Sequence, residues 1–338
     1  SGTRFRGISP KPSGSGDEMR INNAFGYANA AIFLNDNVVM NRVTTSNSIV
    51  DIGELGGTSL AIVGPGNQSA GNVTWRVGAK NTSQTFAGTI ANDNITSVIK
   101  VGSGTWTLSG FNTYTGPTTI SNGVLELTGS LSSTNIAVVA GAFLDVSTLG
   151  NLPLSSGQTL SGNGTVRGGV DASGGGIIAP GFSIGTLTVT NNVTLGGGAT
   201  MEVNRAGFVA DKLVAPAIAF NGTLTLKNIG LALQVGDTFD LFDGALTGSF
   251  TTVSGGYYTW STANLALNGT VTVTGVLPPP TLSFTSTPTD ITLNVAGGLP
   301  GGQLAVVSAT NVAAPLDTWT VVQNDVFDGS GNYTITIP

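Results

Sequence analysis

The chain contains no histidine and no cysteine, and only 9% of its 338 residues are charged, against about 25% in ordinary soluble domains. Without imidazole there is no histidine base, histidine metal ligand or histidine-dependent catalytic triad. Without thiols there is no disulfide, cysteine nucleophile or zinc–thiolate site. The net charge of −6 argues against nucleic acid as a partner, because its binders carry a basic surface. These absences lead us to expect no cofactor.

Long apolar runs are also missing. No run approaches the ~18 residues of a membrane-spanning helix, and residues 1–16 lack the apolar core of a signal peptide, so we interpret the chain as a mature or trimmed product. Glycine is abundant at 50 residues, but hydrophobic residues make up 40%, which argues against disorder. The scarcity of charge and the absence of cysteine suit a bacterial surface or extracellular protein.

Strand patterns dominate what is present. Alternation of threonine with leucine, valine or isoleucine places the apolar side chains on one face of a strand. The clearest examples are residues 186–190, 223–226, 270–274 and 333–337. Residues 18–34 contain several alanines that could form one short helix, but their asparagines and a glycine oppose it. We therefore expect an all-β protein.

A short unit, Gly-Thr followed by alternating apolar residues, recurs along the chain. It occurs at residues 104–108, 164–166, 185–189 and 222–226. The spacing is irregular, on the order of 20 residues, which is within the range of solenoid coils. Each coil of a solenoid buries its inward side chains against its neighbours, so few charges are needed. The repeats favour a solenoid over a sandwich or barrel.

Residues 102–127, GSGTWTLSGFNTYTGPTTISNGVLEL, resemble the autotransporter-associated β-strand repeat. The pattern G-x-G-T-L-T-L-S-G-x-N-T-Y-T-G-x-T-T-I-x-x-G-x-L-x-L is matched at nearly every position, and Trp106, the visible departure, stays apolar. Residues 179–187 (APGFSIGTL) and 236–242 (GDTFDLF) are similar to segments that accompany such repeats. The resemblance extends over about residues 75–275.

This resemblance implies a right-handed parallel β-helix of the kind found in secreted bacterial passenger regions, which are often described as adhesins or surface-layer components. It offers no catalytic residues to transfer. In such a helix we expect Leu108, Ile120 and Leu125 to be buried, and Thr107 and Glu126 to be exposed.

Three consecutive prolines, Pro278–Pro280, stiffen the chain and mark a domain boundary. We predict an N-terminal arm and cap at 1–45, a β-solenoid at 46–275, a Pro-rich linker at 276–280 and a small β-sandwich-like domain at 281–338. Strands of the last domain are expected around Leu282–Thr285, Ile291–Val295, Leu304–Ser308, Thr318–Val322 and Tyr333–Ile337. With 58 residues this domain is marginal, since it buries little surface.

Two groups of carboxylates are weak calcium candidates, because calcium takes oxygen ligands. The first comprises Asp237, Asp240 and Asp243, and the second comprises Asp325 and Asp328. Ordinary turns with solvated acids are the favoured interpretation of both groups. Alternation in the first group places Phe239 and Leu241 inward and Asp240 outward.

The sequence predicts a non-enzymatic protein, with a polysaccharide-degrading enzyme as the weaker alternative. A glycosidase needs two carboxyl groups within about 5–10 Å of each other in one cleft. Of the four glutamates, Glu126 and Glu202 each lie between apolar residues and face outward. No local spacing therefore indicates a catalytic pair.

The aromatic residues allow two interpretations. Tryptophan can stack on sugar rings, and Tyr257, Tyr258 and Trp260 could form an exposed platform. Packing in the core or at corners is favoured for these and for Trp75, Trp106 and Trp319, since aromatic side chains bury large apolar areas.

The two ends of the chain differ in charge. Five of the twelve basic residues lie in the first 42 positions, whereas seven aspartates and no basic residue follow Lys227. Either the two ends are solvated separately, or they meet between molecules and fix register there. Arg4, Phe5, Arg6 and Ile8 are the candidates for adding a strand to another copy.

The function predicted from these features is structural. We expect a secreted bacterial protein that forms a cell-surface or extracellular filament or matrix through head-to-tail contacts between its own copies, because contacts of that kind do not close. The alternative is a monomeric adhesin or glycan-binding passenger, with a surface polysaccharide as partner.

Overall fold

The structure is a computed structural model of the chain. The chain divides into two compact units. The residues it describes are 4–6, 18–21, 26–42, 46–64, 71–92, 94–278, 280–311, 313 and 318–337. The first unit consists of residues 1–232, 237–254 and 261–272. The second consists of residues 233–236, 255–260 and 273–338.

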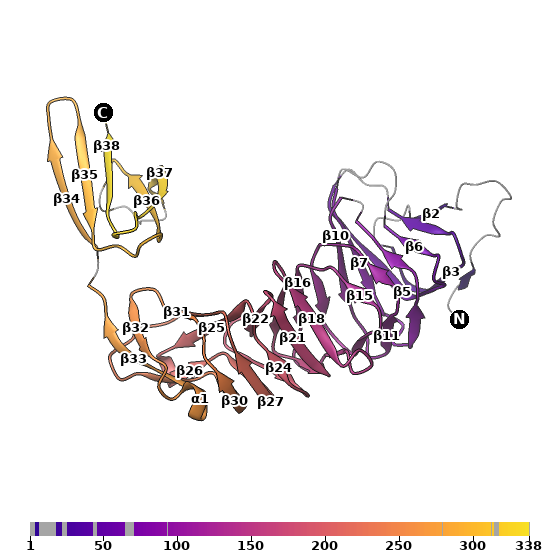
Figure 1. Cartoon of the computed structure of the whole chain (residues 1–338). Coiled ribbons are helices and arrows are strands. Elements are labelled where there is room, and N and C mark those ends of the chain that lie inside the picture. The colour runs from indigo at the N-terminus through magenta and orange to yellow at the C-terminus, as the bar shows by residue number, and fades with distance from the viewer. Residues whose placement is uncertain are drawn as a thin grey trace. The chain divides into compact units, whose positions relative to one another are not determined.

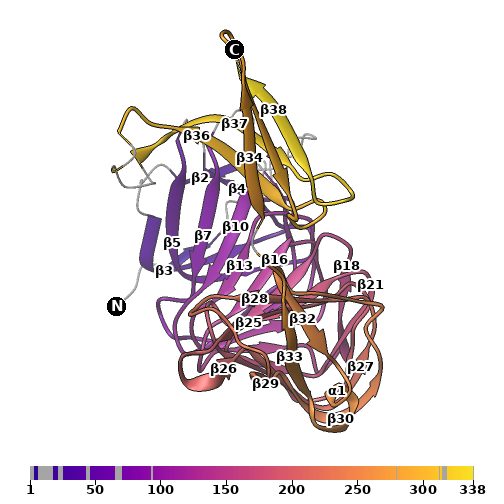
Figure 2. The ribbon, with the colours of Figure 1, turned by 90° about the vertical axis from the view of Figure 1, so that its left-hand side faces the viewer.

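The first unit is a parallel β-solenoid (Figure 1). The strands of one coil pair with the equivalent strands of the next, which builds three faces (Figure 2). The interior between these faces is lined by buried apolar side chains. The alternation seen in the sequence explains this arrangement, because each short strand can direct every second side chain into the interior. The predicted parallel solenoid is thereby confirmed.

Each face is a ladder of parallel strands. The first face begins at Gly26 in β3 (Gly26–Leu34) and continues through β5 (Ser48–Gly57), β7 (Val73–Val77), β10 (Thr96–Lys100), β13 (Thr118–Ile120), β16 (Asn135–Val138), β19 (Thr159–Gly162), β22 (Ile177–Pro180), β25 (Gly198–Asn204), β28 (Thr223–Asn228) and β31 (Thr252–Ser254). The second face contains β1 (Arg4–Arg6), the later parts of β3 and β5, β8 (Gln84–Phe86), β11 (Thr105–Leu108), β14 (Val124–Leu127), β17 (Phe143–Asp145), β20 (Thr165–Arg167), β23 (Thr186–Val189), β27 (Lys212–Phe220) and β30 (Phe242–Gly248).

The third face is divided into shorter sheets. Its strands are β2 (Glu18–Arg20), β4 (Val39–Asn41), β6 (Ile62–Val63) and β9 (Thr89–Ile90), then β12 (Phe111–Asn112) and β15 (Ser130–Leu131), and then β18 (Asn151–Ser155), β21 (Gly169–Gly174), β24 (Val193–Thr194) and the later parts of β27 and β30. The strand β26 (Val209–Ala210) runs antiparallel to β25 after a single turn of 3-10 helix, η1 (Ala206–Phe208).

The interior of the matched repeat agrees with the predicted inward positions. Leu108, Ile120 and Leu125 are completely buried. Thr107 and Glu126 lie on the outer face as expected, but they are half-buried, since the Thr107 hydroxyl donates to Glu126 Oε2 in the next coil at 2.6 Å. Stacked coils therefore cover part of each other's outward side chains as well as their interior.

Close contact between coils explains part of the high glycine content. Gly102 has φ +72°, and a Cβ added there would lie 2.0 Å from the carbonyl oxygen of Gly78 in the preceding coil. Glycine is needed at this corner both for the positive φ and for the backbone approach.

The residues for which a short helix was considered are strands. Residues 18–20 form β2 and Gly26–Leu34 form β3. Within the described parts of the chain, the α-helix is a single turn, α1 (Leu265–Asn268), which ends at Gly269 in the left-handed conformation. Strand pairing across coils outweighs the modest helix propensity of the alanines.

The second unit contains two small antiparallel sheets. One joins β34 (Thr281–Ser286), β35 (Ile291–Ala296) and β38 (Tyr333–Ile337), and the other joins β36 (Gln303–Ser308) with β37 (Thr320–Val326). Residues 258–260 of β32 (Tyr258–Ser261) and 273–276 of β33 (Thr270–Val276) also belong to the second unit. The strand β29 (Thr238–Asp240) belongs to the first unit, where it pairs antiparallel with residues 270–272 of β33. Phe327 and Tyr333 are buried in the second unit, whereas Leu282 and Phe284 are 64% and 68% exposed. The five strands lie close to their predicted positions, but they bury little apolar surface.

Candidate functional site

The matched repeat is held together by a buried lysine. Lys100 lies at the end of β10 with 1% of its surface exposed. Its ammonium group donates to the carbonyl oxygens of Val101 (2.8 Å), Gly102 (2.8 Å) and Asn122 (3.1 Å). Burial lowers the pKa of Lys100 to about 8, since desolvation penalises the charged form. The side chain therefore links the corner turns of two successive coils.

A buried asparagine, Asn112, links successive coils on the third face. The Asn112 side-chain oxygen accepts from the backbone N–H of Ile90 at 3.1 Å, and its Nδ2 donates to the carbonyls of Gly110 and Ser130, both at 3.1 Å. Three consecutive coils are joined through this one amide. Nearby, the Tyr114 hydroxyl is buried and lies 2.6 Å from Thr118 Oγ1. The asparagine of the motif thus satisfies backbone groups inside the solenoid, whereas the tyrosine and threonine hydroxyls pair with each other.

Charged residues on the outer faces pair across neighbouring coils. Asp51 stands directly opposite Arg76 and accepts two hydrogen bonds from its guanidinium. Asp145 stands opposite Arg167, which also lies 3.9 Å from the centre of the Phe143 ring. These opposed charges favour one register of the parallel strands, although exposed pairs contribute little stability.

The assembly candidates lie at the first coil. Arg4, Phe5 and Arg6 form β1, which pairs in parallel with Ala31, Ile32 and Phe33 of β3 in the same chain. Ile8 lies outside the described residues. Strand addition to another copy therefore stays a prediction for these residues.

The weak calcium candidates are separately engaged. Asp237 pairs with Arg205 at 2.9 Å, and Asp240 pairs with Lys212 at 2.6 Å. Asp243 is exposed. Where residues are described, no three acidic side chains come together in a way that could hold a metal ion.

The second calcium candidate is a turn. Asp328 Oδ1 accepts from the backbone N–H groups of Ser330 and Asn332, both at 2.8 Å, and Asp325 accepts from Gln323 at 3.1 Å. Near the first candidate, Phe239 and Leu241 are buried and Asp240 is exposed, as the alternation predicted.

The tryptophans occupy two kinds of environment. Trp75 and Trp106 are buried in the solenoid, and the Trp106 indole donates to the carbonyl of Leu55 at 2.9 Å. Tyr258 and Trp260 meet edge to face with their rings 6.3 Å apart, and both are half-buried, while Tyr257 is 37% exposed. Trp319 is also half-buried. The solenoid tryptophans are core residues, whereas the aromatic group of the second unit keeps partial contact with solvent.

Asp211 is a buried aspartate that the sequence analysis does not predict. Asp211 has 1% exposure, and its two carboxylate oxygens accept from the backbone N–H groups of Gly185 (2.9 Å) and Glu202 (2.8 Å). Burial raises the pKa of Asp211 to about 6, opposed by these hydrogen bonds and aided by the charge of Glu202. It anchors the end of segment 179–187 from a position 26 residues later in the chain, which no local pattern reveals.

Comparisons with known proteins agree with the repeat seen in the structure. Residues 98–127 match the family model described as passenger-associated-transport-repeat. The chain is also 36% identical, over 124 residues, to an extracellular serine protease of Serratia marcescens, a match that covers 36% of this chain and 10% of that protein. The chain therefore spans about a tenth of the relative's length. A secreted or cell-surface location and a passenger-like β-helix are the features these findings support.

The prediction that the chain is not an enzyme is wrong, since the relative is an extracellular serine protease. The prediction relied on the lack of histidine and cysteine and on the placement of glutamates. Serine nucleophiles can also be activated by lysine, so neither absence excludes serine chemistry.

The described residues contain no helix with the length and hydropathy of a membrane span.

Proposed function

We propose that this chain is a passenger-type β-solenoid of a secreted bacterial surface protein and that its copies associate head to tail into an extracellular filament or matrix. The observation that carries the proposal is that the parallel ladders end in strands that are paired on one side. Among the described residues, β1 at the first coil pairs with Ala31–Phe33 of β3 and with no other strand. At the other end, β31 likewise pairs with β28 alone.

An uncovered strand edge offers backbone donors and acceptors to another chain. A second copy can add a strand there, with main-chain hydrogen bonds providing affinity. The contact joins different surfaces of the two copies, so it leaves both ends of the pair free and propagates. Charge favours the same direction, because Arg4, Arg6 and Arg20 lie at the N-terminal end of the chain and the exposed Asp243, Asp325 and Asp328 lie after Lys227.

Light scattering and negative-stain microscopy of the full chain test assembly over a concentration series. Particles that lengthen with concentration support it. Replacing both Arg4 and Arg6 with glutamate should shorten the particles, whereas replacing both with lysine keeps the charge and should preserve them. A monodisperse monomer at high concentration would favour the monomeric adhesin, and retention on an immobilised polysaccharide would then be the measurement to make.

A second candidate function is proteolysis, favoured by the similarity to the Serratia marcescens protease. Incubation of the full chain with fluorescently labelled casein, with and without a serine-directed inhibitor, tests it. Release of labelled peptides that the inhibitor blocks would support proteolysis by this chain. Intact casein after a day at micromolar protein would rule it out for this chain.

A further inference from the structure

Among the described residues, the third face of the solenoid is interrupted at two places, between β9 and β12 and between β15 and β18. At the second place, β15 pairs with β12 of the preceding coil and β18 pairs with β21 of the following coil, but no ladder joins β15 to β18. The other two faces are continuous at the same level, where β16 pairs with β19 and β17 with β20. The interruption is therefore a local feature of the third face and does not break the solenoid.

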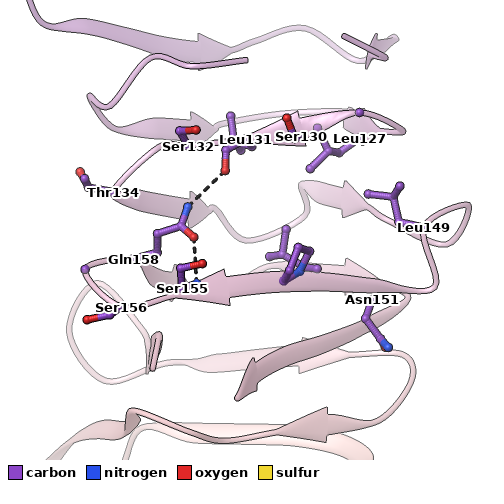
Figure 3. A pocket seen from close by; sticks show the side chains of 14 residues that line it. Leu127, Ser130, Leu131, Ser132, Thr134, Leu149, Asn151, Ser155, Ser156 and Gln158 are labelled. Atoms are coloured by element: carbon purple, nitrogen blue, oxygen red, sulfur yellow. Dashed lines mark hydrogen bonds between the residues drawn. The ribbon is translucent and has the colours of Figure 1, made fainter. Parts of the chain in front are cut away.

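The interruption opens a cavity of about 620 Å³ (Figure 3). Its walls come from residues 127–134 on one side and 149–158 on the other. None of the 14 lining residues is charged; the lining consists of serine, threonine, asparagine, glutamine, glycine, leucine and proline. A volume of this size is typical of small-ligand sites.

The edges of the cavity are closed to an inserted β-strand. Gln158 takes the place of the missing ladder, because its Nε2 donates to the carbonyls of Leu131 (3.2 Å) and Ser133 (3.0 Å) while its Oε1 accepts from the N–H of Ser155 (3.0 Å). Pro153, in the middle of β18, has no N–H to offer. A peptide added here would have to displace the glutamine and would still lack a donor opposite the proline.

Hydroxyl groups line the cavity at positions that a ligand can reach. Ser132, Thr134, Ser155 and Ser156 are all exposed there. A hydroxyl group can both donate and accept a hydrogen bond, so these side chains can pair with the hydroxyls of a bound ligand. Leu149, which is 40% exposed, and Pro153 add aliphatic surface beside these hydroxyls.

We infer that this cavity is a binding site for a neutral saccharide chain. Sugar hydroxyls can both donate to and accept from serine hydroxyls, and the C–H faces of a pyranose ring can pack against leucine and proline. The lining contains no cation, so it does not select phosphate or uronate groups. The site is independent of the proposed assembly, since it lies on the side of the solenoid rather than at its first coil.

Isothermal titration calorimetry of the full chain tests the site. The probes are cellohexaose and maltohexaose as neutral glycans, hexagalacturonate as an acidic one and acetyl-Thr-Val-Thr-Val-Thr-amide as a strand-forming peptide. We expect a neutral hexaose to bind with a dissociation constant below about 1 mM, and the acidic glycan and the peptide to show no heat.

Two variants locate the binding. Ser132→Ala should weaken it about fivefold without lowering the melting temperature, because the hydroxyl that it removes belongs to an exposed residue of the lining. Ser156→Tyr should abolish it by filling the cavity, whereas Ser103→Tyr, at an exposed serine outside the lining, should leave it unchanged. Binding of the peptide, preference for the acidic glycan, equal binding by all variants, or no binding of either neutral hexaose would each overturn the inference.

Discussion

Single residues stabilise the solenoid in two ways. Leucine, isoleucine and valine side chains stack in the interior, and a few buried polar side chains satisfy backbone groups where the chain turns. Leu125 is completely buried, while Lys100 and Asp211 each bind backbone groups from more than one strand or turn. Replacing either kind of residue should therefore destabilise at least two coils.

The substitution Leu125→Ala tests the apolar stack. We expect it to lower the free energy of unfolding by about 2–5 kcal/mol, since it removes transfer energy and leaves a cavity between coils. Thr119→Ala, on the outer face of a neighbouring strand, is the control and should change stability by about 0.5 kcal/mol. Urea unfolding followed by circular dichroism measures both. Equal effects of the two substitutions would show that Leu125 is not part of a close-packed interior.

The buried carboxyl of Asp211 predicts a pH dependence. Its pKa of about 6 in the folded state exceeds the ordinary 3.8, so the folded state binds more protons than the unfolded state between those values. Stability from this group is therefore fully present below about pH 4 and falls as pH rises to about 6, by at most about 3 kcal/mol. Asp211→Asn should flatten this part of the stability curve.

The control for this measurement is Asp243→Asn, which changes an exposed carboxyl. Thermal unfolding between pH 4 and 7 of both variants and the unchanged chain isolates the contribution of Asp211. A curve for Asp211→Asn that is parallel to that of the unchanged chain would contradict the assignment.

The sequence predicted the inward residues but not the buried polar ones. Leu108 and Ile120 follow from alternation alone, because a period of two specifies which side chains share a face. The same rule assigns polar residues to the outside, so it overlooks Lys100 and Asn112. Their partners, such as Asn122 and Ser130, lie about one coil away along the chain, and only the stacking of coils brings them together. The cavity beside Gln158 is likewise created by pairing that fails between distant strands.

Elements are aligned by parallel pairing in fixed register. Thr107 stands opposite Glu126, as Asp51 stands opposite Arg76. A shift by one residue would turn the interior side chains outward, so the apolar alternation enforces the same register that the charges favour. The strand positions of the second unit also follow from alternation.

The second unit buries little apolar surface because it is small, although its strands lie close to their predicted positions.

An engineered disulfide tests the register of the solenoid strands, because the chain has no cysteine of its own. Thr107→Cys combined with Glu126→Cys places two thiols on neighbouring strands, where mild oxidation should form an intramolecular bond. Thr107→Cys combined with Glu202→Cys, on strands separated by several coils, is the control and should keep both thiols free. Mass spectrometry after alkylation counts them. Oxidation of the control pair at the same rate would refute the parallel stacking.

At the scale of the whole molecule, the matched repeat and the similarity to an extracellular protease indicate a protein that is exported from the cell. A solenoid satisfies its backbone coil by coil and needs neither disulfides nor many charges, which is consistent with the composition. The passenger-associated-transport-repeat at residues 98–127 and the similarity to an extracellular protease support a secreted or surface location.

The most direct test of this account is the location of the natural protein in its own cells. Antibodies raised against the folded chain should label intact cells or detect the protein in the medium, and external proteinase K should remove the cell-bound signal without lysis. A cytosolic protein serves as the control and should resist the protease until the cells are broken. Labelling that appears only after lysis, with none in the medium, would contradict a secreted passenger-like β-solenoid.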